Sequence, residues 1–462
     1  MESRRTFLTR LGGLIGLMAG NSWLSAVAAS KVKTYALPRP LVSASAERVR
    51  VAAIGMGIMG FQDTRSALKV PGVELVGVAD LYDGRLQRAR EIFGNHIYTT
   101  RHYQELLNRN DVDAVLIAPA DLWHQTITID ALKAGKAVYC EKPMVQHLDQ
   151  GADVIVAAQQ SGRPLQVGSQ RVSSVLYEQA KKLYEAGEIG DLNLVEARID
   201  RHDALGAWQY SIPPDASPQT LDFDTFLKDT SKVPFDPVRF FRWRNYRAYG
   251  TGIPGDLFVH LLSGLHFITG AIGPERIYAT GMLSYWKDGR DVPDIMAALL
   301  DYPASTGRHP AFRVMLEVNF ADGSGGGSYT RLVGTEGVIE IGDHTCRLRR
   351  QPLPQAPGYG GWDSFDTFPE DVQKAFVAEY NRKYPPQTRI APPAEEIVFT
   401  APEGYDDHQA HMQRFIDAVR GEASIIEDAT FGFRAAAPAL ACNLSYEQQK
   451  PIYWDARQMK LR

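Results

Sequence analysis

Glu141 and Lys142 stand side by side where an apolar run, 138–140, ends, and Pro143 follows them. Two charges at the end of a buried strand cost free energy unless a ligand or another charged group needs them. A lysine there could hydrogen-bond a substrate hydroxyl and hold down the pKa of that hydroxyl, as general acid–base chemistry requires. Pro143 restricts the backbone that aims both charges. The alternative is a solvated ion pair, because surface pairs are common and contribute little.

An acid and a histidine four residues apart form a second candidate site. Asp256 and His260 lie in the otherwise apolar segment PGDLFVHLLSGLHFITG, and their spacing places them on one face of a helix. Buried Asp and His need partners, and titratable groups with perturbed pKa values concentrate in active sites. A histidine satisfied within the core is the alternative, and we interpret His266, which lies off that face, in this way.

A glycine-rich turn indicates a dinucleotide site. VRVAAIGMGIMG ends in Gly55-x-Gly57-x-x-Gly60, directly after a strand-like run and before a helix pattern. Such glycines permit a tight turn and close backbone approach, so that a pyrophosphate can lie at the helix N-terminus. Asp80, 20 residues after Gly60, ends the next apolar run, where a carboxylate would bind ribose hydroxyls and repel a 2′-phosphate. NAD is therefore favoured over NADP, although Arg85 could soften that preference. A turn that binds no ligand is the alternative.

The elements that must position these residues follow two patterns. Between residues 48 and 170, continuously apolar runs alternate with helix-like segments such as HQTITIDALKAG, which indicates a doubly wound parallel sheet, the Rossmann fold of α/β proteins. Lys142 would lie at the carboxyl edge of that sheet, where such sheets bind ligands. Residues 171–462 change to strand-like segments joined by turns, which predicts an α+β domain with a large, mostly antiparallel open sheet. Residues 351–406, rich in Pro, Gly and aromatic residues, are expected to form an irregular insertion.

The N-terminus has the features of an export signal. Arg4 and Arg5 precede a short apolar stretch, which ends in an A-x-A sequence at residues 26–28. This order is typical of a twin-arginine (Tat) signal, which exports folded proteins. We expect residues 1–30 to be this signal, residues 31–47 to be a linker, and the protein to act in the periplasm or otherwise outside the cytoplasm. A frayed amphipathic N-terminus is the alternative.

Composition argues against several classes of partner. A net charge of -4 over 462 residues gives no reason to expect nucleic acid or an anionic membrane surface. No internal apolar run reaches the roughly 18 residues of a membrane-spanning helix. Cys140, Cys346 and Cys442 are widely scattered without a C-x-x-C pair, which favours buried thiols over a disulfide framework, and we expect no metal. The open sheet favours a homo-oligomer, either a dimer or a tetramer.

Several segments resemble one known family. GMGIMG, VGVAD, APADLWHQTITIDALKAGKAVYCEKPM and GIPGDLFVHLLSGLHFITG are similar to segments of the glucose–fructose oxidoreductase / inositol dehydrogenase / rhizopine-catabolism (Gfo/Idh/MocA) family, and the resemblance covers residues 48–462. It implies that Lys142, Asp256 and His260 are catalytic. The histidine would take the hydroxyl proton as hydride leaves for nicotinamide, and the aspartate would fix its tautomer or bind substrate. Glu141 would orient the lysine or the nicotinamide ribose. The family often has an acid where Ser263 stands.

The residues expected at the site fall into two sets. The cofactor set comprises Gly55, Gly57, Ile58, Met59, Gly60, Asp80, Pro119, His124, Glu141 and Lys142. The substrate set comprises Trp123, Gln170, Arg171, Arg242 and Trp243. The last two belong to RFFRWRNYRAYG, residues 239–250, where arginines alternate with aromatic residues. Such a segment suits a sugar site and a subunit interface equally well.

Export constrains the function, since no pool of free coenzyme exists outside the cytoplasm. We therefore expect a tightly bound NAD that is recycled within the site. The favoured hypothesis is an oxidoreductase that transfers hydride between a sugar or glycoside hydroxyl, at C3 of a hexose, and this cofactor. The alternative is an NAD-dependent glycosidase, which oxidises C3 transiently to permit elimination. It would need a further acid for the leaving group. A non-catalytic sugar-binding protein is a third hypothesis, and the retained Lys142, Asp256 and His260 argue against it.

Overall fold

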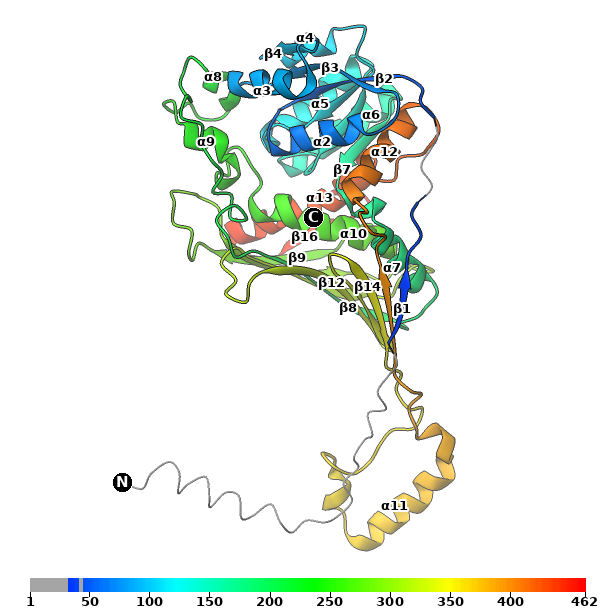
Figure 1. Ribbon diagram of the computed structural model, residues 1–462. Helices are drawn as coiled ribbons and strands as arrows, with labels where there is room; N and C mark the ends of the chain where they lie inside the picture. Colours follow the sequence, from blue (N-terminus) through cyan, green and yellow to red (C-terminus); the bar gives the residue numbers. More distant parts are fainter. Residues whose placement is uncertain (1–31, 41–44) are drawn as a thin grey trace, which may run out of the picture.

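The computed structural model describes residues 32–40 and 45–462, so the expected export signal, 1–30, lies outside the described residues. Figure 1 shows a helix-wrapped body, which contains the glycine-rich turn, above a second body built on a wide sheet. Within the described part of the chain, no helix combines the length and the apolar character needed to cross a membrane.

The first body is a six-stranded parallel sheet in the order β4-β3-β2-β5-β6-β7. Its strands are β2 (Val49–Ile54), β3 (Val73–Ala79), β4 (Tyr98–Thr100), β5 (Ala114–Ile117), β6 (Ala137–Glu141) and β7 (Leu165–Gly168). Its helices are α2 (Ile58–Leu68), α3 (Asp83–Phe93), α4 (Tyr103–Leu107), α5 (His124–Lys133) and α6 (Gly151–Ser161), with the short turns η1 (Asp121–Trp123) and η2 (Leu148–Gln150). The predicted doubly wound fold is confirmed.

Both faces of this sheet are buried, as continuously apolar strands require. In β2, Val51 and Ala53 join one hydrophobic core, while Ala52 and Ile54 join the other. The first of these cores also contains Phe415 of α12 (Asp407–Val419), a helix from near the end of the chain. Figure 1 shows α12 beside the first body, so a C-terminal segment completes the Rossmann domain.

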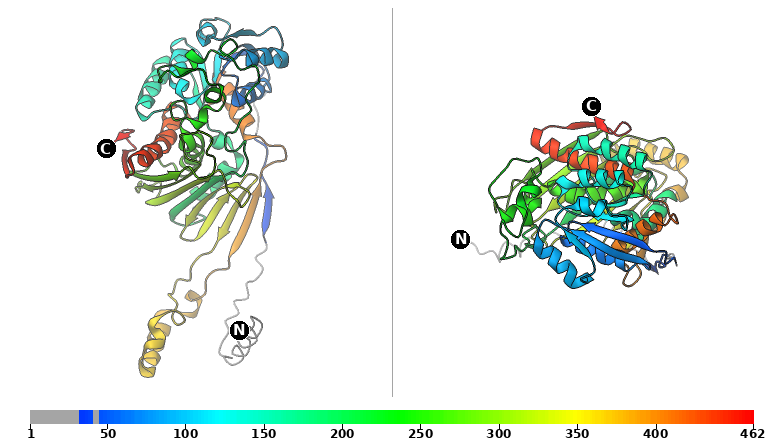
Figure 2. Two further views of the ribbon diagram at one scale, coloured as in Figure 1. Left: turned by 90° about the vertical axis from the view of Figure 1, so that its left-hand side faces the viewer. Right: turned by 90° about the horizontal axis from the view of Figure 1, so that it is seen from above.

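The second body is an eleven-stranded, mostly antiparallel sheet in the order β1-β15-β14-β13-β12-β8-β11-β10-β9-β16-β17, as predicted. Its strands are β1 (Lys33–Ala36), β8 (Leu192–Asp200), β9 (Arg276–Met282), β10 (Ile295–Tyr302), β11 (Phe312–Asn319), β12 (Gly327–Gly334), β13 (Gly337–Ile341), β14 (Thr345–Arg350), β15 (Glu395–Thr400), β16 (Ile452–Asp455) and β17 (Lys460–Leu461). Its upper face packs against α7 (Val175–Glu185), α10 (Val259–Thr269) and α13 (Ala429–Gln448), and Figure 2 shows that the opposite face carries no helix of the described chain.

A long excursion between β8 and α10 runs along the first body. Its elements are α8 (Phe223–Leu227), α9 (Pro237–Phe241), η4 (Trp243–Asn245) and the π-helical turn η5 (Pro254–Phe258). The Tyr82 hydroxyl donates to Asp215 Oδ1 at 2.5 Å, and Lys228 Nζ donates to the Leu122 carbonyl at 2.9 Å. These bonds fasten the excursion to the Rossmann domain, beside the end of β3.

Two expectations differ from the structure. The expected linker, 31–47, contains β1, which pairs in parallel with β15. The expected irregular insertion, 351–406, contains β15, the 14-residue helix α11 (Glu370–Lys383) and the short turns η6 (Ser364–Thr367) and η7 (Pro386–Thr388). Flanking Pro and Gly residues obscured the helical pattern, although Glu370 and Asp371 are typical of a first helical turn. Figure 2 shows α11 projecting away from both bodies.

One short turn and the three cysteines complete the description of the fold. The turn η3 (Gln170–Ser173) follows β7 and leads into α7. All three cysteines are buried and free, as predicted.

Candidate active site

The turn between β2 and α2 is built to hold a pyrophosphate. Gly55 has φ +86°, and an added Cβ would overlap the backbone of Pro119; an added Cβ on Gly60 would overlap the carbonyl of Gly55. At Gly57, by contrast, the nearest atom to an added Cβ is a guanidinium nitrogen of Arg85 at 3.9 Å, so this position opens outward. Gly57, Ile58 and Met59, where α2 begins, line a cavity, and a helix N-terminus suits the phosphates of a dinucleotide.

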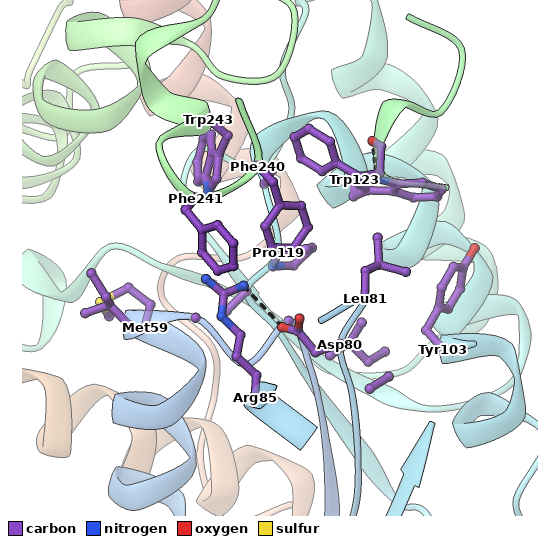
Figure 3. A pocket seen from close by; sticks show the side chains of 18 of the residues that line it. Met59, Asp80, Leu81, Arg85, Tyr103, Pro119, Trp123, Phe240, Phe241 and Trp243 are labelled. Carbon is purple, nitrogen blue, oxygen red and sulfur yellow. Dashed lines mark hydrogen bonds and ion pairs between the residues drawn. The ribbon is translucent and has the colours of Figure 1, made fainter. Parts of the chain in front are cut away.

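A cavity of about 620 Å³ extends from this turn between the Rossmann domain and the excursion, and its volume suits a small molecule or cofactor. Its Rossmann wall includes Gly55, Gly57, Ile58, Met59, Asp80, Leu81, Arg85, Tyr103, Pro119 and Trp123. Its opposite wall includes Tyr210, Phe240, Phe241, Trp243 and Arg244 of the excursion. Figure 3 shows Phe240, Phe241 and Trp243 above Asp80 and Arg85. Eight of the expected site residues thus line one cavity: Gly55, Gly57, Ile58, Met59, Asp80, Pro119, Trp123 and Trp243.

Asp80 and Arg85 share the end of the cavity beside β3. The Asp80 carboxylate accepts hydrogen bonds from the backbone N–H of Met56 at 2.7 Å and of Tyr82 at 2.9 Å. Arg85 lies 3.4 Å from the same carboxylate, as the dashed line in Figure 3 marks. The guanidinium also lies 5.4 Å from the centre of the Phe240 ring. An acid and a cation therefore both stand where the ribose of a dinucleotide is expected.

A buried ion pair joins the two bodies. Lys142 Nζ, at the end of β6, donates to Asp256 Oδ1 at 2.8 Å and to the Asp256 carbonyl at 2.7 Å. The two side chains are only 10% and 13% exposed, which excludes a solvated surface pair. Trp208 Nε1 and Arg244 Nε donate to the same carboxylate, each at 3.2 Å. Burial alone would raise the pKa of Asp256. The charge of Lys142, followed by those of Arg244 and Arg201, outweighs burial and holds that pKa well below its usual range.

The helix that carries Asp256 and His260 differs from the expected one. Asp256 lies in the π-helical turn η5, and α10 begins only at Val259, so the two residues do not share a regular α-helix. An added Cβ on Gly255 would overlap the side chain of Thr251, which shows how tightly this turn is packed. Such π turns recur at functional sites, and a spacing of four residues does not reveal them.

His260 is held as a neutral imidazole. Burial, followed by the charges of Lys142 and Arg171, places the pKa of His260 well below its usual range. Its Nδ1 lies 3.5 Å from the hydroxyl of Ser169, at the end of β7. A neutral imidazole beside an ionised aspartate and a lysine can accept a proton. His266 differs, because its Nε2 lies 2.8 Å from the Tyr302 hydroxyl within the core.

A group of buried acids lies behind Lys142. Burial raises the pKa of Glu141 to about 7, and Gln170 Nε2 lies 3.4 Å from its Oε1. Where the family often has an acid, Ser263 donates to Glu427 Oε2 at 2.8 Å. Glu427 is fully buried, and burial raises its pKa well above the usual value. A glutamate from the turn before α13 therefore supplies a carboxyl group close to the position where the family carries one on α10.

Several expected site residues do not line this cavity, and three of them make other contacts. The ring of His124 is buried, with Nδ1 2.7 Å from the Pro143 carbonyl and Nε2 3.3 Å from that of Pro119, so it braces two loops. Arg242 donates to the Tyr210 carbonyl at 2.8 Å. Arg171 lies over the ring of Tyr177, beside a separate, much smaller cavity above the sheet.

Other residues were missed. Phe240, Phe241 and Arg244 belong to the predicted arginine–aromatic segment, but alternation alone does not tell which arginine faces the cavity. Trp208 has φ +64°, is fully buried, and bonds Asp256; no sequence pattern marks it. The cavity lining does not include Lys142, Asp256 or His260. Arg244 connects this group of residues to the cavity, because it lines the cavity and bonds Asp256.

Curated relatives match about a third of the chain. The inositol 2-dehydrogenase of Salmonella paratyphi B is 32% identical over 167 residues, which are 36% of this chain and 49% of that protein. The Glycosyl hydrolase family 109 protein 1 of Shewanella sp. MR-4 is 31% identical over 175 residues, 34% of this chain and 37% of that protein. The chain therefore matches about half, or less, of the length of these relatives.

Solved structures share the fold over nearly the whole chain. The scyllo-inositol dehydrogenase of Lactobacillus casei, with bound NAD(H) and scyllo-inositol, has a TM-score of 0.59 at 18% identity and covers 88% of this chain and 99% of its own. The aldose-aldose oxidoreductase of Caulobacter crescentus, complexed with glycerol, has a TM-score of 0.60 at 16% identity and covers 88% and 100%.

Two family models match. "Oxidoreductase family, NAD-binding Rossmann fold" matches residues 49–169, and "Oxidoreductase family, C-terminal alpha/beta domain" matches residues 226–453. Together they span most of the chain and both bodies of the fold. The protein belongs to the Gfo/Idh/MocA family of oxidoreductases.

Proposed function

We propose that the protein is a sugar oxidoreductase that transfers hydride between a hydroxyl-bearing carbon of a sugar or glycoside, C3 of a hexose, and a tightly bound NAD. The observation that carries this proposal is the buried Lys142–Asp256 pair, which joins the carboxyl edge of a Rossmann sheet to the π turn before His260. The relative named inositol 2-dehydrogenase and the dinucleotide-shaped turn support it.

The residues of the chain divide the chemistry among them. A bound nicotinamide would supply the hydride acceptor. His260, neutral because of burial and nearby cations, takes the proton from the substrate hydroxyl. Lys142 donates a hydrogen bond to the oxygen and stabilises the negative charge that develops there. Asp256, held ionised, keeps the lysine in place, while Trp208 fixes the second carboxylate oxygen.

The excursion supports tight retention of the cofactor. Phe240 and Phe241 cover the end of the cavity beside Asp80, and the Tyr82–Asp215 hydrogen bond fastens this cover to the Rossmann domain. A dinucleotide beneath it would dissociate only when the segment lifts. Asp80 favours NAD, and the adjacent Arg85 leaves room for some use of NADP.

The absorbance band of reduced nicotinamide, at about 340 nm, tests the function. Glycosides are added to the purified protein, and both the absorbance and the release of aglycone are followed. A change in absorbance without aglycone release is the expected result. Release with no net redox change would identify the alternative, an NAD-dependent glycosidase, which the family 109 relatives favour. No response at all would contradict both.

Export and assembly complete the proposal. The twin arginine and the A-x-A sequence support export to the periplasm, which N-terminal sequencing of the mature protein from a periplasmic fraction would test.

The open face of the large sheet supports a homo-oligomer. Tyr278, Leu299 and Met315 are direct neighbours across β9, β10 and β11, and are 44%, 43% and 45% exposed. An exposed apolar patch of this kind marks an interaction surface.

A further inference from the structure

Three basic side chains surround the carboxylate of Asp256, just beyond the lining of the cavity. Lys142 Nζ and Arg244 Nε lie 2.8 and 3.2 Å from the same oxygen of Asp256. Arg201 adds a third positive charge, strong enough to help lower the pKa of that carboxyl. Their one common carboxylate cannot neutralise three cations. Since unpaired buried charge is costly, this arrangement indicates that a ligand supplies a further negative charge.

The neighbouring acids offset this excess only in part. Burial raises the pKa of Glu141 to about 7, which weakens its negative charge near neutral pH. The charge of Asp121 helps to raise the pKa of Arg244, but its Oδ2 already accepts hydrogen bonds from the backbone N–H and the hydroxyl of Thr251. Neither acid has an ion pair with Arg244 or Lys142 among the described residues.

Arg244 has the geometry of a carboxylate receptor. Its Nε is fixed on Asp256, and its guanidinium lies 4.2 Å from the centre of the Trp243 ring. Within the described chain, no hydrogen bond or ion pair engages its two terminal nitrogens, and the residue lines the cavity. Two parallel N–H groups held in this way fit the two oxygens of a carboxylate.

We propose that the substrate is an anionic sugar, a uronic acid or a glycoside of one, and that the terminal nitrogens of Arg244 bind its carboxylate. The inference rests on the proposed function, because it names the class of sugar that the same site oxidises. Trp243 and Tyr210, beside Arg244 in the cavity wall, offer aromatic faces to the sugar ring. The carboxylate would thereby hold the ring with its hydroxyls directed toward Lys142.

Matched sugars test this directly. Calorimetric titration of the purified protein with glucuronate and glucose, and with galacturonate and galactose, compares pairs that differ only in the oxidation of C6. We expect the uronate of at least one pair to bind about 10- to 100-fold more tightly, the range of a charge-assisted hydrogen bond. The preference should shrink as ionic strength rises.

Two variants locate the effect. Arg244→Gln removes the cation and should bring the affinity ratio close to one, mainly by weakening the uronate. Arg239→Gln is the matched control, because Arg239 belongs to the same arginine–aromatic segment but pairs with Asp236 at 3.4 Å and does not line the cavity. It should leave the ratio unchanged. Thermal melting of both variants monitors the fold, and the wild-type ratio remains decisive if either variant fails to fold.

The outcomes separate the inference from the function. Equal or tighter binding of the neutral sugar in both wild-type pairs would overturn the inference, as would an Arg244→Gln variant that weakens both members equally or a wild type that binds none of the four. Reduction of the bound cofactor by glucose but not by glucuronate would overturn it while supporting the proposed function. Uronate binding with no change in absorbance for any sugar would instead overturn the proposed function.

Discussion

At the scale of single residues, the chemistry depends on charges that the protein buries and then pairs. Lys142 and Asp256 come from different bodies, and each leaves water only because the other compensates it. His260 has no such partner among the described residues, which is why burial and the nearby cations keep it neutral. In the proposed mechanism, His260 can therefore accept a proton before any substrate arrives.

Removing the ammonium group should stop turnover. In Lys142→Met, kcat should fall about 10²- to 10⁴-fold, because the developing oxyanion loses its donor and Asp256 loses its main counter-charge. Bound NAD should remain, since the glycine-rich turn is untouched. Turnover and cofactor content per chain are the two measurements. Lys133→Met, on the exposed end of α5, is the control and should behave as wild type. A variant that loses its cofactor would show that Lys142 has been assigned the wrong role.

The acid limb of the pH profile should reflect His260. Protonated imidazole cannot accept the hydroxyl proton, so kcat/KM for oxidation falls as pH drops through the pKa of His260, which lies well below the usual value of 6.5. Activity should therefore persist below pH 6. Because Glu141 titrates near 7, the profile of Glu141→Gln is measured in parallel, and the low-pH limb should survive in it. An acid limb at pH 6.5 or above in both proteins would contradict the assignment.

At the scale of elements, the turn between β2 and α2 contains one glycine that we assign to cofactor binding and another that the fold requires. Gly57 faces open space, whereas Gly60 packs against the carbonyl of Gly55. The same substitution at the two positions should thus have different consequences.

Gly57→Ala should weaken NAD binding at least about 10-fold while the melting temperature of the cofactor-free protein stays within about 2 °C of wild type. Gly60→Ala should lower both the NAD affinity and the melting temperature, because the added Cβ would overlap the carbonyl of Gly55. Fluorescence titration with NAD and calorimetric melting check the pair. Equal NAD affinity in Gly57→Ala and wild type would mean that the turn does not hold the pyrophosphate.

The docking of α12 should make stability pH-dependent. His411 donates from Nε2 to the Val167 carbonyl and lies 2.8 Å from the Ser173 hydroxyl, and burial lowers its pKa to about 4. The unfolded chain binds this proton below about 6.5 and the folded protein only below about 4, so the stability is complete above pH 6.5 and is lost as pH falls toward 4. The loss amounts to about 3 kcal/mol.

Urea unfolding at pH 7 and pH 4.5 measures this effect. His411→Gln keeps a donor but does not titrate, so its stability should fall less between the two pH values than that of wild type. Burial lowers the pKa of His266 to about 3. This histidine should account for part of the pH dependence of the unfolding free energy that remains in the variant. If the variant and wild type lost the same stability between pH 7 and pH 4.5, His411 would be excluded as the cause of the pH dependence.

The element scale also shows where sequence reasoning stops. Apolar runs and glycine spacing predicted the Rossmann strands and the turn, because those patterns arise from the local backbone. Pairing of β1 with β15 and the packing of α12 on the first sheet depend on contacts across more than 300 residues, which no local pattern encodes. For the same reason Lys142 and Asp256 could be predicted as separate charges, whereas Trp208 and Glu427 emerged only from the fold.

At the scale of the whole molecule, the open sheet face and the projecting helix α11 both point away from the cavity. The apolar patch of Tyr278, Leu299 and Met315 lies on the sheet face that no described helix covers. The cavity and the exposed apolar patch therefore lie on opposite sides of the protein.

A charge in the middle of that patch should disrupt assembly. Leu299 lies between Tyr278 and Met315 in the strand register. The variant Leu299→Asp should therefore run as a monomer in size-exclusion chromatography with light scattering, because a buried unpaired charge would destabilise the interface. Tyr285→Asp, at a residue 67% exposed outside the strands, should leave the mass unchanged. A wild type that runs as a monomer at micromolar concentration would contradict the interface itself.

A crystal structure with NAD and a sugar tests the central claim most directly. The account predicts the pyrophosphate on the Gly55–Gly60 turn, a ribose at Asp80, and a substrate hydroxyl within hydrogen-bond distance of both Lys142 and His260. A dinucleotide outside the cavity, or a sugar whose hydroxyls contact neither of those two side chains, would contradict it.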